Sequence, residues 1–227
     1  MRESAMQKFD TPTLVSVVLD IPAGRIRTIA ADRTDTTVEV LPLDASKSRD
    51  VKAAEETGIA YADGVLRVEA PDAKNRVLGS SGSVEVTVRV PAGSHVQATS
   101  ASAELLGEGR LGDVTFESSN GAVKLDETAS ARLALLAGDI TVGRLGGPGE
   151  ITTEKGDIHI AEAVHGVVTL RTVSGDVTVG AAHGVSVGLD AGTTLGRIHN
   201  ALQNTDGAPA LTIRATTTHG DIFARSL

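Results

Sequence analysis

Three aspartates, Asp139, Asp157 and Asp176, each follow a glycine at the same point of a repeated sequence pattern. If the repeats are stacked strands, neighbouring carboxylates lie roughly 4.8 Å apart. Carboxylate oxygens at that spacing could bind a hard cation such as Ca²⁺. The alternative is that each Asp accepts backbone N–H bonds and caps its own turn. The row is interrupted by Ala122 before it and Arg197 after it, which favours the turn interpretation. We therefore expect no metal, and these three residues are the candidate ligands should one bind.

Two other motifs resemble cofactor-binding or catalytic signatures. Residues 107–112 match the glycine pattern of a dinucleotide-binding loop, but residues 113–116 alternate like a strand where that loop requires a helix. Residues 184–188 match the Gly-x-Ser-x-Gly pattern of a hydrolase nucleophile. Apolar residues alternate there as well, so Ser186 is better explained as an outward residue of a strand. We predict no catalytic residues and no cofactor.

The composition removes further classes of function. The chain has no cysteine, which excludes disulfide frameworks, thiol catalysis and cysteine-ligated zinc. The six histidines lack the i, i+2 or i, i+4 spacing of a local metal site. Only four residues are Phe or Tyr and none is Trp, so the chain offers few of the aromatic platforms that sugar-binding and single-strand nucleic-acid sites use.

Charge and hydropathy bear on partners and location. The net charge is −8, from 21 basic and 29 acidic residues, and it repels a phosphate backbone. We therefore expect no nucleic-acid partner. No apolar run approaches the roughly 18–20 residues of a membrane span, and the first 21 residues do not have the pattern of a secretory signal. We expect a cytoplasmic protein with no membrane span.

The second half of the chain repeats at its glycines, and this is the strongest signal in the sequence. Successive aligned glycines lie 17 to 24 residues apart. They are Gly121, Gly138, Gly156, Gly175, Gly196 and Gly220. A strand precedes each glycine and another follows it, and the glycine supplies the positive φ of a tight corner. The nearly constant period predicts a parallel β-solenoid of about six rungs. An antiparallel β-meander or sandwich, with hairpin turns at the glycines, is the alternative.

Alternation within each repeat predicts which side chains point inward. The inward row two positions after the glycine comprises Val123, Ile140, Ile158, Val177, Ile198 and Ile222. The outward row, one position further on, comprises Lys124, Thr141, His159, Thr178, His199 and Phe223. Equal spacing would let each inward side chain stack on its equivalent in the neighbouring rung.

The first hundred residues predict a β-rich N-terminal region. Apolar alternation and flanking turn residues indicate strands at 14–21, 25–29, 37–41, 65–69 and 84–90. Residues 49–56 are the one plausible helix, and 72–83 has the glycine and serine content of a loop. We expect a β-rich region at 1–100 and the repeat solenoid at 101–227, continuous with each other as one domain.

Phe223 is the candidate interface residue. It belongs to the outward row, whose other members are polar or charged, and it lies in the last repeat of the sequence. With no capping helix after it, that repeat would form the end of the stack and expose unpaired backbone groups. We therefore predict a homo-oligomer, as a dimer, with this rung in or near the interface. The alternative is a monomer in which the insertion at 204–209 covers the edge.

The repeats together resemble the bacterial putative-adhesin family of β-strand-repeat proteins, a domain of unknown function. The resemblance rests on the Gly-Asp-Ile/Val-x-Val repeats, on the segments 17–26 and 82–94, and on the ending 219–222. It covers the chain from about residue 14 onward. It implies a β-solenoid-like fold and a non-enzymatic role, and it supplies no catalytic residues.

These observations predict a non-enzymatic structural or protein-interaction module, whose partner is another protein or a second copy of the chain. A ligand- or cation-binding β-solenoid is the first alternative. A polysaccharide-acting enzyme is the second, and the scarcity of aromatic residues disfavours it.

Overall fold

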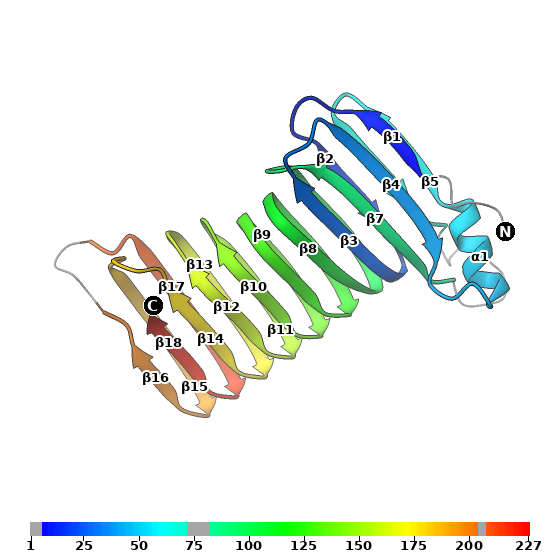
Figure 1. The fold of residues 1–227 in the computed structure, drawn as a ribbon. Helices are drawn as coiled ribbons and strands as arrows, with labels where there is room; N and C mark the ends of the chain where they lie inside the picture. Colours follow the sequence, from blue (N-terminus) through cyan, green and yellow to red (C-terminus); the bar gives the residue numbers. More distant parts are fainter. Residues whose placement is uncertain (1–5, 72–81, 204–207) are drawn as a thin grey trace. The chain divides into compact units, whose positions relative to one another are not determined.

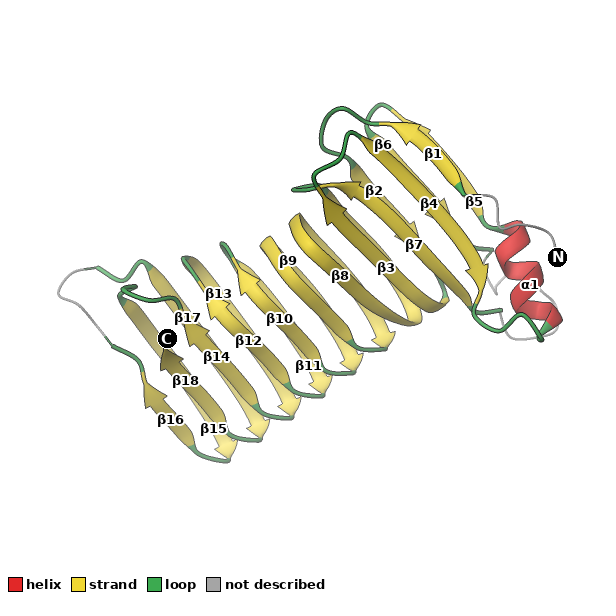
Figure 2. Ribbon diagram, in the orientation of Figure 1, coloured by secondary structure: helices red, strands yellow, loops and turns green. Residues whose placement is uncertain are grey.

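The computed structural model describes residues 6–71, 82–203 and 208–227. They form two compact units that divide between Asn120 and Gly121. Strands make up almost all the regular structure, and the described residues contain a single helix (Figure 2). The predicted all-β class is confirmed. Each unit is described below by itself.

The first unit contains two sets of paired strands that share the long strand β8 (His95–Asn120). One set is, in order, β5 (Gly58–Ala62), β6 (Val65–Glu69), β2 (Ser16–Asp20) and the first residues of β8. The other set is β1 (Gln7–Asp10), β4 (Asp35–Pro42), β7 (Val84–Pro91), β3 (Ala23–Ala31) and a later part of β8. The pairs β1–β4, β4–β7 and β5–β6 are antiparallel, and the others are parallel. Five strands were expected here from alternation, and all five are present.

The helix α1 (Ser48–Glu56) lies where residues 49–56 predict it. It buries Ala53 and Asp50, and the Asp50 carboxylate accepts the backbone N–H of Ser83 at 3.0 Å. The helix ends at Thr57, whose hydroxyl donates to the carbonyl of Ala53 at 2.8 Å. Most of the loop expected at 72–83 lies outside the described residues.

The second unit is a parallel β-solenoid. One set of strands is, in spatial order, the first half of β9 (Val123–Ala137), β10 (Ile140–Leu145), β12 (Ile158–Ala163), β14 (Val177–Ala181), β18 (Ile222–Ser226) and β16 (Ile198–Ala201). The other is the second half of β9, β11 (Gly149–Lys155), β13 (Gly166–Ser174), β17 (Leu211–His219) and β15 (Val187–Leu195). Every one of these pairings is parallel, which confirms the solenoid over the antiparallel meander.

The inward row has the register that the glycine alignment predicts. Ile140 pairs with Val123 on one side and with Ile158 on the other, and Val177 pairs with Ile158 and Ile222. These five side chains are fully or almost fully buried. Each rung therefore buries its apolar face against its neighbours, as a stacked repeat requires.

The order of the last two rungs differs from their order in the sequence. Figure 1 shows β17 and β18 lying between β13–β14 and β15–β16. The prediction that the last repeat ends the stack is therefore wrong. The inward side chains favour this order, because the β15–β16 rung carries Asn200 in the row where the β17–β18 rung carries Ala224. The more polar rung occupies the end, where water can solvate it.

Candidate interaction edge of the second unit

The rung β15–β16 ends the stack of described strands. Among the described residues β15 pairs with β17 alone and β16 with β18 alone. The N–H of Ile222 donates to the carbonyl of Arg197 at 2.9 Å, so the backbone groups of Arg197 face β18. Backbone groups alternate sides along a strand. The N–H and C=O groups of Ile198 and Asn200 therefore face away from β18, on the free side of β16.

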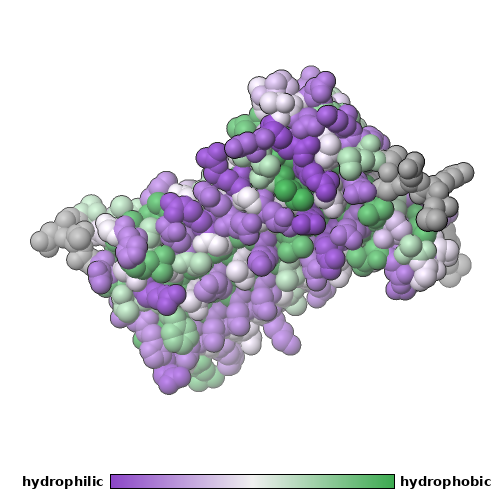
Figure 3. Space-filling view, viewed as in Figure 1, coloured by the Kyte–Doolittle hydropathy of each residue, from purple (hydrophilic) through white to green (hydrophobic). Residues whose placement is uncertain are grey.

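Apolar side chains are exposed at this end. Ile198 is 44% exposed, whereas Ile222 and Val177, its equivalents in the two preceding rungs, are 0% exposed. Leu195, at the corner between β15 and β16, is 62% exposed. Figure 3 shows hydrophobic patches among polar surface at this end of the second unit. We call the side of this rung that faces away from β17 and β18, from Leu195 to Asn200, the β15–β16 edge.

Phe223 lies one rung in from this edge. Its side chain points outward, as predicted, and is 37% exposed. Its ring stacks on that of His199, with the centroids 4.8 Å apart and the planes 3° from parallel. Phe223 therefore supports β16 from the adjacent strand β18. Its participation in an interface stays a prediction.

The predicted aspartate row forms a ladder of hydrogen bonds along the glycine corners. The Asp139 carboxylate accepts the backbone N–H of Asp157 at 2.9 Å, and Asp157 accepts that of Asp176 at 2.8 Å. Asp176 in turn accepts the N–H of Asp221 at 2.7 Å. Each carboxylate thus joins two neighbouring rungs, whereas the sequence suggested that it would cap its own turn. Asp221 is a fourth member of the ladder, because β18 lies next to β14 in the stack.

Arg197 ends the ladder on the β16 side. Its backbone N–H donates to the Asp221 carboxylate at 2.8 Å, and its guanidinium donates to the second oxygen at 3.1 Å. These bonds, first the backbone N–H and then the guanidinium, hold the pKa of Asp221 below its usual value. An Arg at this corner gives the next rung outward no carboxylate to bond, which suits a rung at the end of the stack.

The other sequence-predicted sites are parts of strands and turns. In the described part of the chain, no three His, Cys, Asp or Glu side chains are grouped so as to hold a metal ion. Residues 107–112 lie inside β8. Ser186 precedes β15, which begins at Val187, so its assignment to a strand is wrong, and its carbonyl accepts the N–H groups of Ala210 and Leu211. The first motif lies within a strand, and the second runs directly into a strand where a hydrolase nucleophile requires a helix.

A threonine row at the same corners was not found from the sequence. Thr172 donates from its hydroxyl to the Gly156 carbonyl of the neighbouring rung at 3.0 Å. The equivalent bonds join Thr153 to Gly138, Thr217 to Gly175 and Thr193 to Gly220 at 2.9–3.3 Å. The signal was available, because each threonine lies three positions before a corner glycine. Threonine, glycine and aspartate together link each of these corners to the next.

The ladder predicts that Asp157→Ala lowers stability more than Asp157→Asn. Alanine removes the acceptor of the Asp176 N–H, and one such hydrogen bond contributes about 1 kcal/mol net. Asparagine keeps an oxygen in place and should lose only a fraction of that. Urea unfolding followed by circular dichroism measures both variants. Equal stability of Asp157→Ala and the wild type would show that the ladder contributes nothing.

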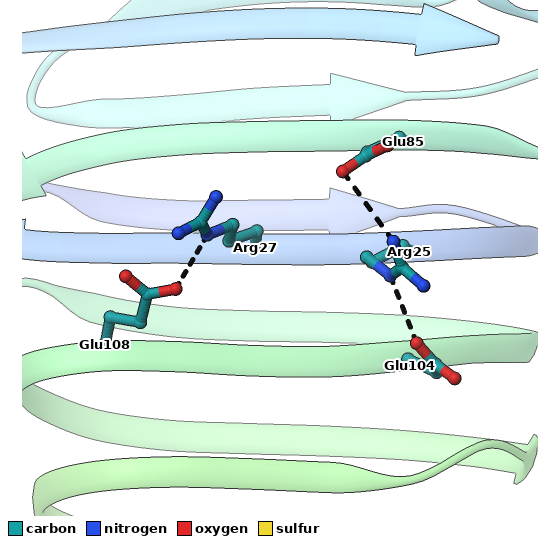
Figure 4. A network of polar contacts seen from close by, with 5 residues as sticks. All are labelled: Arg25, Arg27, Glu85, Glu104 and Glu108. Carbon is teal, nitrogen blue, oxygen red and sulfur yellow. Dashed lines mark hydrogen bonds and ion pairs between the residues drawn. The ribbon is translucent and has the colours of Figure 1, made fainter. Parts of the chain in front are cut away.

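A second polar network lies on the first unit, on β3, β7 and β8 (Figure 4). Arg25 contacts Glu104 at 3.1 Å and Glu85 at 4.0 Å, and Arg27 contacts Glu108 at 2.7 Å. The hydrogen bond and charge of Glu108 raise the pKa of Arg27 above its usual value. These charges satisfy one another across three strands, and exposed pairs of this kind contribute little to stability. These ion pairs are better explained as contacts that hold the register of β3, β7 and β8 than as a binding site for a charged ligand.

No helix in the described ranges has the length and apolar character needed to cross a membrane.

Comparison with known proteins gives a family match over most of the chain. The model of the family described as Toastrack DUF4097 matches residues 14–224. No curated protein matches the chain.

Solved structures are similar over nearly the full length at low identity. A putative cell adhesion protein from Clostridium sporogenes is 10% identical, with 99% of this chain and 100% of that one covered and a TM-score of 0.43. A putative adhesin from Bacteroides fragilis is 11% identical, with 99% and 98% covered and a TM-score of 0.45. A putative lipid binding protein from Parabacteroides distasonis is 10% identical, with 97% of each chain covered and a TM-score of 0.47.

Proposed function

We propose that this chain, which belongs to the Toastrack DUF4097 family, is a non-enzymatic interaction module that self-associates through the β15–β16 edge. The observation that carries the proposal is the contrast in burial along one apolar row. Ile198 is 44% exposed, whereas its equivalents in the other rungs are buried. The backbone N–H and C=O groups of Ile198 and Asn200 face away from β18, on the free side of β16. A strand edge of this kind readily pairs with another chain.

The composition of β16 supports pairing at this edge. Lysine, proline and inward-pointing charges are among the features that protect natural edge strands, and the sequence of β16, Ile-His-Asn-Ala, contains none of these three. The chain carries a net charge of −8, so two copies repel over most of their surface. β16 has no acidic residue, and the adjacent Asp221 is paired with Arg197. A second copy therefore meets little repulsion there.

The non-enzymatic part of the proposal is supported by what the conspicuous polar residues do. Asp139, Asp157 and Asp176 accept backbone N–H groups, and the corner threonines donate to glycine carbonyls. These side chains hold the rungs together. Each carboxylate uses one oxygen, and each hydroxyl its hydrogen, in a bond that holds the fold, whereas a catalytic group must be directed at a substrate.

Ile198→Lys should convert the protein from dimer to monomer. At micromolar concentration we expect light scattering to give twice 23.2 kDa for the wild type and 23.2 kDa for the variant. A lysine at this position places an ammonium group where the second copy would bury an apolar side chain. The matched control is Val173→Lys, at a side chain that is 50% exposed on β13 in the same unit. It should leave the dimer intact.

A monomeric wild type would contradict the proposal, and so would equal loss of the dimer in both lysine variants. Phe223→Ala should weaken the dimer less than Ile198→Lys does, because it removes only the ring that supports His199. A cytoplasmic location, and the folding of both units as one domain, are further expectations that accompany the proposal.

A further inference from the structure

We infer that the second copy adds its own β16 antiparallel to this β16, about a two-fold axis that passes beside Asn200. The inference rests on the proposed self-association and specifies its register. A two-fold axis makes the interface isologous, so both copies use the same edge. When this axis is perpendicular to the sheet that contains β16, the two β16 strands pair antiparallel.

The backbone of β16 fits this arrangement. The N–H and C=O groups of Asn200 face the free side of the strand, as argued above from the bond between Ile222 and Arg197. Two facing Asn200 residues can therefore exchange both hydrogen bonds, as directly opposed residues do in an antiparallel pair. In this register Ile198 lies opposite Leu202 of the second copy, so its exposed side chain gains an apolar neighbour.

The side chain of Asn200 explains why this register is preferred. Its row is otherwise apolar, and consists of Leu125, Val142, Ile160, Val179 and Ala224. The Asn200 side-chain oxygen accepts the backbone N–H of Leu202 at 3.0 Å, and the amide nitrogen still has two hydrogens to donate. Across the axis each amide can donate to the oxygen of the other. A single buried asparagine that pairs only with itself is an effective means of fixing register.

The competing arrangement has its two-fold axis parallel to the strands. It would place β15 of the second copy beside β16. The inward positions of β15 are Val187, Leu189, Ala191 and Thr193, and three of these four are apolar. The Thr193 hydroxyl already donates to the carbonyl of Gly220. The amide of Asn200 would therefore be covered without a matching partner, which is unfavourable for a buried polar group.

Single-cysteine variants test the register, because the chain has no cysteine of its own. Opposed residues of a hydrogen-bonded antiparallel pair have Cα atoms roughly 5.5 Å apart, within the range that a disulfide spans. The backbone pairing and the contact between Ile198 and Leu202 remain when the Asn200 amide is removed, so under mild oxidation Asn200→Cys should yield mostly covalent dimer. His199→Cys is the matched control on the same exposed strand. In this register position 199 faces position 201 of the second copy, so the two thiols introduced by His199→Cys are too far apart and should yield little covalent dimer.

Light scattering of the reduced variants separates the two proposals. If the reduced proteins are dimers and Asn200→Cys alone cross-links, the register is supported. If they are dimers and Asn200→Cys does not cross-link, or His199→Cys cross-links equally well, the register is wrong and the self-association stands. If they and the wild type are monomers, both proposals fail. Asn200→Asp gives an independent readout, because two carboxylates at the axis repel and should raise the dimer dissociation constant at pH 7 at least tenfold.

Discussion

Replacing Ile140 by aspartate should unfold the second unit. Ile140 is completely buried between Val123 and Ile158, and the apolar rows around it offer no partner for a carboxylate. Burying an unpaired charge costs several kcal/mol, against a typical total stability of about 5–15 kcal/mol. Circular dichroism and thermal melting should show the loss of the native transition, or a transition that is lowered by tens of degrees.

The neighbouring position provides the control. Thr141 belongs to the outward row and lies beside Lys124 and His159. A carboxylate at Thr141→Asp stays in contact with water, and Lys124 can pair with it. The expected loss is about 1 kcal/mol, mainly because aspartate is a poor strand former. Equal damage from both variants would mean that the assigned inward and outward faces are wrong.

The solenoid and its rows could be predicted because local physics determines them. Alternation decides which side chains of a strand are buried, and a glycine at a fixed interval marks a corner that other residues adopt poorly. Ile158 and His159 therefore have predictable faces in every parallel stacking of these repeats. The same rules identified α1 and five strands of the first unit.

The order of the rungs could not be obtained from the same signals. Gly196 and Gly220 open nearly identical corners, and Ile198 and Ile222 both fit next to Val177. Local pattern does not distinguish two rungs that share a motif, and the choice depends on non-local energies. The sequence did contain a clue in Asn200, a polar residue in an apolar row. A rung that would bury an amide between apolar neighbours is better placed at the end of the stack.

The candidate edge was missed for the same reason. Phe223 was correctly assigned to the outward face, but the edge was assigned to its own rung. Once β15–β16 is placed at the end, the exposed side chains become Ile198 and Leu195. The aspartate ladder shows the same dependence, because Asp176 bonds Asp221, 45 residues away, and does not bond the next repeat in the sequence.

Gly156→Ala should be among the most damaging single-methyl substitutions in the protein. Gly156 has φ +144°, and a Cβ built on it would lie well under 3.0 Å from the carbonyl of Gly138 in the adjacent rung. The substitution forces a strained backbone, which costs about 1–3 kcal/mol, and it also pushes two rungs apart. We expect a total loss on the order of 3 kcal/mol or more, which corresponds to a fall of roughly 10 °C in Tm for a chain of this size.

Two glycines of the same unit separate the contributions. Gly184 has φ +73° with open space around its virtual Cβ, and Gly192 has open space and no left-handed φ. Gly184→Ala should therefore show the backbone cost alone, about 1 kcal/mol, and Gly192→Ala should stay within about 0.5 kcal/mol of the wild type. The expected order of melting temperatures is Gly192→Ala above Gly184→Ala above Gly156→Ala. If Gly156→Ala has the same melting temperature as Gly184→Ala, the positive φ alone explains why glycine is required at position 156. If Gly156→Ala has the same melting temperature as Gly192→Ala, the close approach of neighbouring rungs does not explain the glycines at the corners.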